Sequence, residues 1–220
     1  QLAMRTLDEM KAVLAPQLAH GAIRIGMVGD IDENAAINAV AVSLGALPNR
    51  SANPASQMSI RPAQFTTNRA PRTLYHAGSV DQGVIALTWP TNDDSDFKAT
   101  IARSLLAEVM GLRLIDVLRE QLGATYTPNA SLEDSATYKG FGYLTASAPA
   151  TPDAMDTVAQ AIRQIATDLR TAPPSADELL RARKPILERW QRQARDNNSW
   201  IGLVAEAQRA PADLDWRRTR

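Results

Sequence analysis

The sequence predicts an α+β fold, a mostly antiparallel sheet with helices packed on one face. Strand-like segments follow one another without a helix between them, which favours antiparallel pairing. Amphipathic helical stripes occupy separate stretches of the chain. The composition, 45% hydrophobic and 22% charged, is ordinary for a globular protein, and 220 residues suffice to bury a core without disulfides. The length by itself allows one large domain or two small ones.

Helical and strand patterns alternate in the first part of the chain, before a proline-rich segment. Residues 2–14 have helical spacing, and residues 22–28 alternate as a buried strand does. Asp30 or Asp32 is predicted to cap the next helix. Residues 48–71 hold four prolines and show no sustained hydrophobic period, so we expect a long internal loop there that is more mobile than the rest.

The remainder of the chain predicts two strands, a long helix, two further strands and two helices. Gly111 could divide the long helix, since glycine is a weak helix former. Thr151 is expected to cap the first of the last two helices, a Ser175–Glu178 capping box to open the second, and Pro185 to kink it. The predicted elements are 73–76, 83–89, 97–122, 124–132, 138–148, 151–169 and 175–190.

Several classes of chemistry are disfavoured by the composition. The 24 basic and 24 acidic side chains balance, so nothing indicates nucleic acid or a membrane surface as a partner. The chain has no cysteine, and His20 and His76 stand far apart, outside any H-E-x-x-H or H-x-x-E-H pattern. We therefore expect no metal ligands and no zinc catalysis within this chain.

One constellation remains, where the long helix turns into a strand at residues 118–126. Arg119 lies in the last helical turn and Tyr126 near the start of the strand, with Gly123 between them. A helix–glycine–strand turn can direct both side chains into one cleft. The pattern is equally typical of an arginine that complements the helix dipole and a tyrosine in the core. The residues alone leave both interpretations open.

Further motifs occur in a fixed order along the chain, before and after this turn. A strand leads into V-G-D-I-D, a helix ends in L-G-A-L-P, and Q-G-V-I-A-L precedes the long helix. L-R-E-Q-L-G-A-T-Y follows, then the strand at 138–146 and the D-E-L helix that contains Lys184. Over nearly the whole chain, this order resembles a C-terminal-type domain of the pitrilysin/insulinase family of zinc metallopeptidases.

The resemblance implies that residues 1–220 form a single non-catalytic domain that completes a closed substrate chamber. In the family, the zinc-binding H-x-x-E-H helix lies in an N-terminal-type domain, of the same or a partner chain, and zinc-bound water performs the hydrolysis. The arginine and tyrosine of the turn reach that site and hold the peptide substrate and the developing oxyanion. Carried over, these roles fall to Arg119 and Tyr126, both hydrogen-bond donors to negative charge.

Two other functions are compatible with the same sequence. One is a structural or regulatory subunit, like the core proteins of respiratory complexes, and the other is a free-standing protein-binding scaffold. The chain opens on Gln1 and closes on a short basic run, so we expect a piece of a longer protein. The family's habit in bacteria suggests the periplasm.

Overall fold

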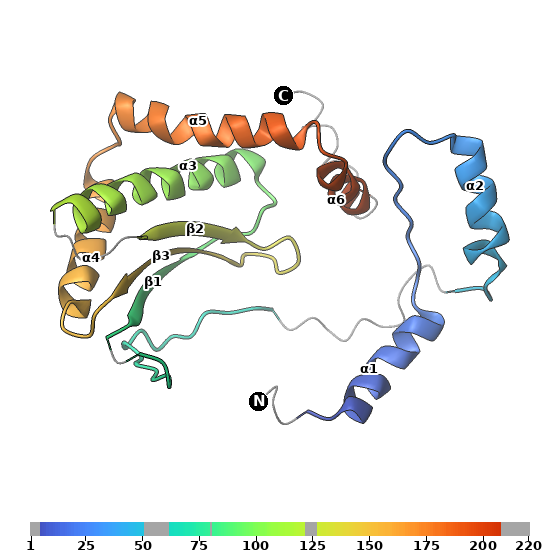
Figure 1. The fold of residues 1–220 in the computed structure, drawn as a ribbon, viewed down its shortest axis with the longest axis horizontal. Helices are drawn as coiled ribbons and strands as arrows, with labels where there is room; N and C mark the ends of the chain where they lie inside the picture. Colours follow the sequence, from blue (N-terminus) through green and yellow to red (C-terminus); the bar gives the residue numbers. More distant parts are fainter. Residues whose placement is uncertain (1–4, 51–61, 80, 122–126, 208–220) are drawn as a thin grey trace. The chain divides into compact units, whose positions relative to one another are not determined.

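The computed structural model describes residues 5–50, 62–79, 81–121 and 127–207 (Figure 1). The chain divides into two compact units, residues 61–189 and residues 1–60 with 190–220. Part of the expected loop at 48–71 and part of the 118–126 turn lie outside the described residues, so their predicted properties stay predictions.

The central unit is built on a three-stranded antiparallel sheet of order β1-β3-β2. Strand β1 spans Gly83–Thr91, β2 Asn129–Asp134 and β3 Gly142–Ala150. In the register, Ala146 of β3 lies between Leu87 of β1 and Ala130 of β2. The α+β class with antiparallel pairing is confirmed.

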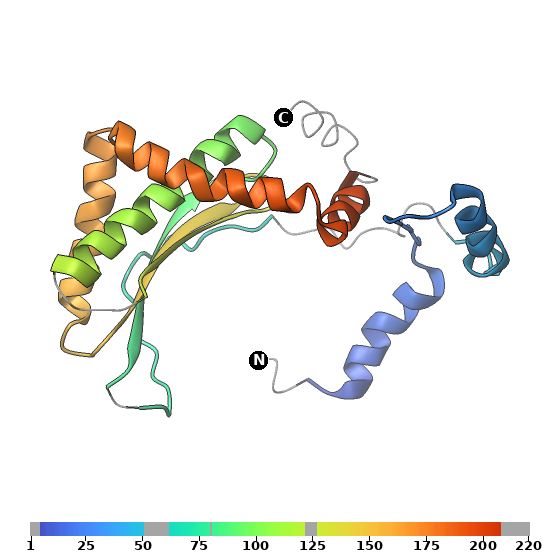
Figure 2. The same ribbon diagram turned by 45° about the horizontal axis from the view of Figure 1, so that its top comes forward.

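Helices α3 (Phe97–Leu114) and α4 (Met155–Thr171) pack on one face of this sheet (Figures 1 and 2). Burial alternates along β3, so every even-numbered residue of that strand lies under the helices. The core is one cluster of apolar side chains from α3, β3, α4 and the turn after α3: Ala107, Met110, Leu114, Leu118, Leu144, Ala146, Ala148, Ala150, Val158, Ile162 and Ile165.

Helix α3 runs through Gly111 without a break, contrary to the expectation, and passes into a π-helical segment, η3 (Ile115–Gln121). Met110, Leu114 and Leu118 are fully buried at a spacing of four residues. A glycine inside a helix costs about 1 kcal/mol relative to alanine. Burial of each large side chain beside it offsets more than that, so packing keeps the helix continuous.

Two predicted helix starts have different outcomes. Helix α4 begins at Met155, and Thr151 closes a preceding turn through its backbone oxygen, which accepts from the Ala154 N–H at 3.0 Å. Thr151 is therefore not the cap that the sequence predicts. Helix α5 spans Ala176–Gln193 and continues through Pro185. Its capping box is confirmed, because the Ser175 N–H donates to Glu178 (2.8 Å) and the Glu178 N–H to the Ser175 hydroxyl (3.2 Å).

The expected strands at 22–28 and 73–76 are absent from the structure. Ile23 and Met27 are 45% and 44% exposed, where the sequence predicts burial. Alternation specifies which face a strand buries but not which strand it pairs with, and an unpaired strand is not stable. In the second segment, local bonds of His76 fasten a turn instead: Nδ1 accepts from the Gly78 N–H and Nε2 donates to the Gln82 oxygen, both at 2.9 Å.

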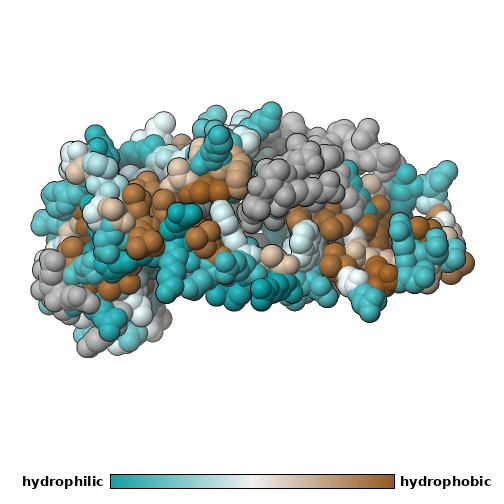
Figure 3. Space-filling view, turned by 90° about the horizontal axis from the view of Figure 1, so that it is seen from above, coloured by the Kyte–Doolittle hydropathy of each residue, from teal (hydrophilic) through white to brown (hydrophobic). Residues whose placement is uncertain are grey.

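The other unit contains α1 (Leu7–His20), α2 (Glu33–Val42), the short 3-10 turn η2 (Leu44–Ala46) and α6 (Asn197–Ala207). Asp32 is confirmed as the cap of α2, accepting from the Ala35 N–H at 2.8 Å. Neither α1 nor α2 has a buried residue, and apolar side chains are visible at the surface in Figure 3. No helix in the described parts of the chain is long and apolar enough to cross a membrane.

Two ion pairs join α5 to α3 within the central unit. The Arg113 guanidinium donates to both oxygens of Glu178, at 2.6 and 3.3 Å, and both side chains are only about 20% exposed (20% and 21%). The bonds from Arg113 and from the Ser175 N–H lower the pKa of Glu178 to about 2. Arg189 donates to Glu108 at 2.6 Å nearer the surface.

We expect Glu178→Gln to lower the free energy of unfolding at neutral pH by about 1–3 kcal/mol, since charge-assisted bonds to a shielded guanidinium are lost. The folded-state pKa of Glu178 is depressed from 4.5 to about 2. Its stabilisation is therefore full above the unfolded pKa and disappears as pH falls towards 2. Urea unfolding of both proteins across this pH range should show the difference narrowing with acidification.

The matched control is Glu108→Gln, whose partner Arg189 is 52% exposed. Solvent screens such a pair, so its loss should cost under about 1 kcal/mol. If Glu178→Gln and wild type differ by the same amount at every pH, the titration of Glu178 is not coupled to folding.

Candidate functional site

Arg119 lies in the π-helical segment η3, at the end of the long α3–η3 rod. Its neighbour Leu118 is fully buried in the core, whereas Arg119 is exposed. The guanidinium forms no hydrogen bond or ion pair with any described residue. Single π-helical turns inside helices occur frequently at functional sites. The core therefore anchors this turn, and the Arg119 side chain is exposed beside it without a bond to the described residues.

Tyr126, the other predicted site residue, lies outside the described residues, as does the turn at 122–125. Strand β2 begins at Asn129, whereas the sequence predicts that this strand begins at residue 124. The geometry that brings Arg119 and Tyr126 into one cleft stays a prediction.

The sheet face opposite α3 and α4 is polar and almost uncharged. Three hydroxyl side chains lie in a row across it, since Thr145 of β3 pairs with Thr88 of β1 and Ser131 of β2, and Thr88 and Thr145 approach to 3.1 Å. Glu133 is the one charged side chain among the strand residues of this face. Such a surface offers hydrogen bonds without selecting a ligand by charge.

Aromatic rings cover the hairpin end of this open face. Phe65, from the segment before β1, stacks on Phe141 with 4.5 Å between ring centroids and 14° between planes. Tyr143 and Tyr138 meet Phe141 edge-on at 6.2 and 6.3 Å. No pattern in the sequence indicates this cluster, because Phe65 lies in a segment without a hydrophobic period that would point to its partner.

A second cluster that the sequence did not indicate joins the same hairpin to α3. Arg103 donates to the carboxylate of Asp134 at 2.8 Å (Nε) and to the backbone oxygen of Asp93 at 2.7 Å (Nη2). Hydrogen bonds from Ser95 and from the Gly140 N–H, with the nearby Arg103 charge, lower the pKa of Asp93. Both carboxylates are fully engaged by donors, so the cluster fixes the hairpin and offers no free acid or base.

Nothing in the described parts of the chain gathers three or more residues able to hold a metal ion. The two histidines are unsuited to it in different ways. His20 is exposed at the end of α1, and both ring nitrogens of His76 already bond to the backbone. The donor set of the described residues does not fit zinc.

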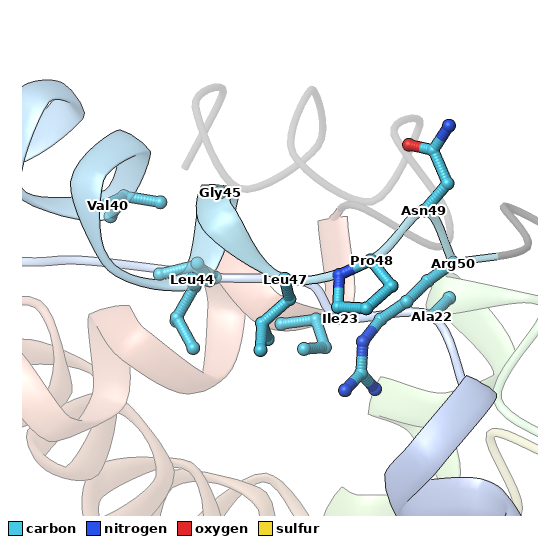
Figure 4. A pocket seen from close by; sticks show the side chains of 10 residues that line it. Ala22, Ile23, Val40, Leu44, Gly45, Leu47, Pro48, Asn49 and Arg50 are labelled. Carbon is cyan, nitrogen blue, oxygen red and sulfur yellow. The ribbon is translucent and has the colours of Figure 1, made fainter.

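The other unit carries a shallow hollow of about 320 Å³ (Figure 4). Its lining includes Ile23, Leu44, Leu47 and Asn49. Arg50, at its edge, donates through Nη1 to the backbone oxygens of Leu18 (2.8 Å) and Gly21 (3.1 Å). These bonds satisfy carbonyl groups at the end of α1, so the Arg50 guanidinium stabilises the end of that helix.

The family is shown by comparison with known proteins. Residues 6–186 match the family model of the peptidase M16 inactive domain. The chain belongs to this family, the non-zinc-binding domain of the pitrilysin/insulinase metallopeptidases. It is also 29% identical over 108 residues to the chloroplastic stromal processing peptidase of Pisum sativum. This match covers 49% of this chain and 8% of that enzyme.

Solved structures share the fold at low sequence identity. A conserved protein from Enterococcus faecalis aligns over 96% of this chain and 48% of its own, with a TM-score of 0.71 and 16% identity. The periplasmic protease PqqL from Escherichia coli aligns over 82% of this chain and 20% of its own (TM-score 0.63, 15% identity). A third structure is the inactive peptidase domain of a Bordetella parapertussis protein described as a putative zinc protease. It aligns over 63% of this chain and 75% of its own, with a TM-score of 0.52 and 21% identity.

The chain thus spans a small part of its first-matched relatives, 8% of the pea enzyme and 20% of PqqL. In a protein of this family, the inactive domain implies that zinc is held by another domain.

We predict that the purified 220-residue chain binds no stoichiometric zinc and hydrolyses no peptide. Two separated histidines and no cysteine cannot supply a tetrahedral nitrogen and sulfur ligand set. Elemental analysis after dialysis against a weak chelator measures the zinc content. One tightly held zinc ion per chain would contradict the prediction.

Proposed function

We propose that this domain completes the substrate chamber of a zinc-dependent peptidase and supplies Arg119 and Tyr126 to a zinc site on another domain. The observation that supports the proposal is the exposed Arg119, without a partner among the described residues, at a core-anchored π-helical turn. It occurs in a chain of the inactive-domain family. A free guanidinium at a rigid turn is suited to hold a ligand that arrives from outside the domain.

The chemistry of the two side chains fits a peptide undergoing hydrolysis. Arginine presents planar, permanently charged donors that match the carbonyl and carboxylate oxygens of a peptide. A tyrosine hydroxyl can donate to the oxyanion that forms when water attacks the carbonyl. The water would be activated by zinc in the partner domain, so this chain's residues bind and stabilise while the other domain performs the attack.

The partner in this proposal is an N-terminal-type, H-x-x-E-H-bearing domain of the same or a second chain. The length of the relatives supports it, because PqqL is far longer than this chain and its first half has been solved as a separate piece. PqqL is described as a periplasmic protease. A periplasmic peptidase is therefore the setting that we propose for the whole protein.

A structural or regulatory subunit, or a protein-binding scaffold, is the second candidate function. The described residues hold no cluster of metal ligands, which is as compatible with this function as with the first. The two functions differ in what they require of Arg119 and Tyr126. A scaffold needs neither side chain for turnover, whereas a chamber domain needs both.

In the full-length protein, Tyr126→Phe should lower peptide turnover by about 10²–10³-fold, since one donor to the developing oxyanion is lost while the ring remains. Arg119→Ala should weaken peptide binding as well as turnover, because it removes both charge and reach. Steady-state hydrolysis of a fluorogenic peptide gives kcat and KM for each variant. Thermal unfolding should be nearly unchanged, since an exposed charge contributes little to stability.

Arg163 is the matched control, an exposed arginine on α4 without an ion-pair partner among the described residues. Arg163→Ala should leave kcat and KM unchanged. Wild-type turnover in Tyr126→Phe would falsify the catalytic role and favour the scaffold function. A loss of activity that tracks a lower melting temperature would assign both residues to folding.

A further inference from the structure

Two adjacent carboxylates at the end of β2 lie in opposite environments. The Asp134 side chain is only 4% exposed and accepts from Arg103 (2.8 Å) and the Thr91 hydroxyl (3.1 Å). Because side chains alternate along a strand, Glu133 lies on the open face, where it is exposed. Its carboxylate forms no hydrogen bond or ion pair with any described residue, and Lys139 of the same hairpin does not pair with it. One carboxylate is therefore neutralised within the domain, and the other is not.

The residue opposite Glu133 in the sheet is Tyr143 of β3. Directly opposite residues of an antiparallel pair have their side chains on the same face, with Cβ atoms about 5 Å apart. On the other side of Tyr143, the register places Pro90 of β1. A proline, an aromatic ring and a carboxylate thus form a row across the open face.

More aromatic surface adjoins this row. Tyr143 meets the rings of Phe65 and Phe141 edge-on, with 6.5 and 6.2 Å between centroids. These nearly equal distances place Tyr143 beside the stack that Phe65 and Phe141 form, not on either end of it. All three rings are only half-buried. Aromatic surface therefore remains accessible next to the unneutralised carboxylate.

The hairpin that carries these groups is fastened from its other face (Figure 1). The Gly140 N–H donates to the Asp93 carboxylate at 2.6 Å, and Arg103 donates to the backbone oxygen of Asp93 at 2.7 Å as well as to Asp134. These bonds join the β2–β3 turn to α3 and to the segment that precedes it. A ligand on the open face would meet a backbone that is already ordered, which lowers the entropy cost of binding.

We propose that Glu133 and the Tyr143 ring form a subsite for a basic side chain of a peptide substrate. The inference rests on the proposed function, a domain that handles peptides, and it names the class of side chain that this face selects. The methylene stem of lysine or arginine would lie along the ring while the charged head reaches the carboxylate. The ring face attracts a cation within about 6 Å of its centroid, and a guanidinium also fits a carboxylate with two parallel bonds. Because Glu133 is the one charged residue among the strand residues of this face, it sets the sign of the preferred charge.

The test uses the full-length protein and two fluorogenic peptides with blocked termini. The peptides differ at one central position, which holds arginine in the first and citrulline in the second. Citrulline keeps the shape of arginine and lacks its charge. The ratio of the two kcat/KM values measures the preference for a basic side chain. If neither peptide is hydrolysed, fluorescence anisotropy of dye-labelled versions measures the same preference in binding.

Wild-type protein should prefer the arginine peptide by about fivefold to tenfold, since an exposed ion pair and an exposed cation–π contact each contribute a few-fold. Glu133→Gln and Tyr143→Leu should each reduce this preference to about twofold. The matched control is Glu188→Gln on α5, which removes another exposed carboxylate without an ion-pair partner among the described residues and should keep the wild-type preference. Glu133→Gln is a nearly isosteric surface change, so it tests the subsite even if Tyr143→Leu fails to fold.

Other outcomes would overturn the inference. They are a wild-type preference that survives in Glu133→Gln or in folded Tyr143→Leu, and an equal loss of preference in Glu188→Gln. Hydrolysis of both peptides at equal rates by wild-type protein would also overturn it and would leave the proposed function standing. Binding of the arginine peptide that depends on Glu133, without hydrolysis, would support the subsite and reject the peptidase function. Failure to bind or hydrolyse either peptide would reject both.

Discussion

The burial of one face of β3 is the constraint on which the central unit depends. Each even-numbered residue of this strand lies beneath α3 and α4, and the small side chains Ala146 and Ala148 allow the helices to approach closely. Because side chains alternate along a strand, the same burial leaves every odd-numbered residue on the opposite face. The mainly polar open face of the sheet follows from this choice.

Helix α3 and the π-helical segment η3 connect this core to Arg119. Met110, Leu114 and Leu118 hold it to the sheet, and their spacing continues into the π-helical turn. Arg119 is adjacent to the last of these anchors and is exposed. The packing of Leu118 holds the backbone at this position, whereas the exposed Arg119 side chain keeps its rotamer freedom and would lose entropy on binding a ligand.

Charged groups in the central unit divide into two kinds. Arg103, Arg113 and Arg189 bind carboxylates and fasten α3 to the hairpin and to α5. Arg119 makes no such bond with the described residues.

The sequence by itself determined the antiparallel α+β class and the capping box at Ser175. Periodicity and capping act within a few residues and can be read locally. Only the tertiary structure decided that α3 runs through Gly111, that Phe65 stacks on Phe141 and that Arg113 pairs with Glu178. These outcomes depend on packing between segments far apart in the chain. The strand predicted at residues 22–28 is absent for the same reason. Alternation specifies the face that a strand would bury, whereas a strand also needs a partner strand that no local pattern specifies.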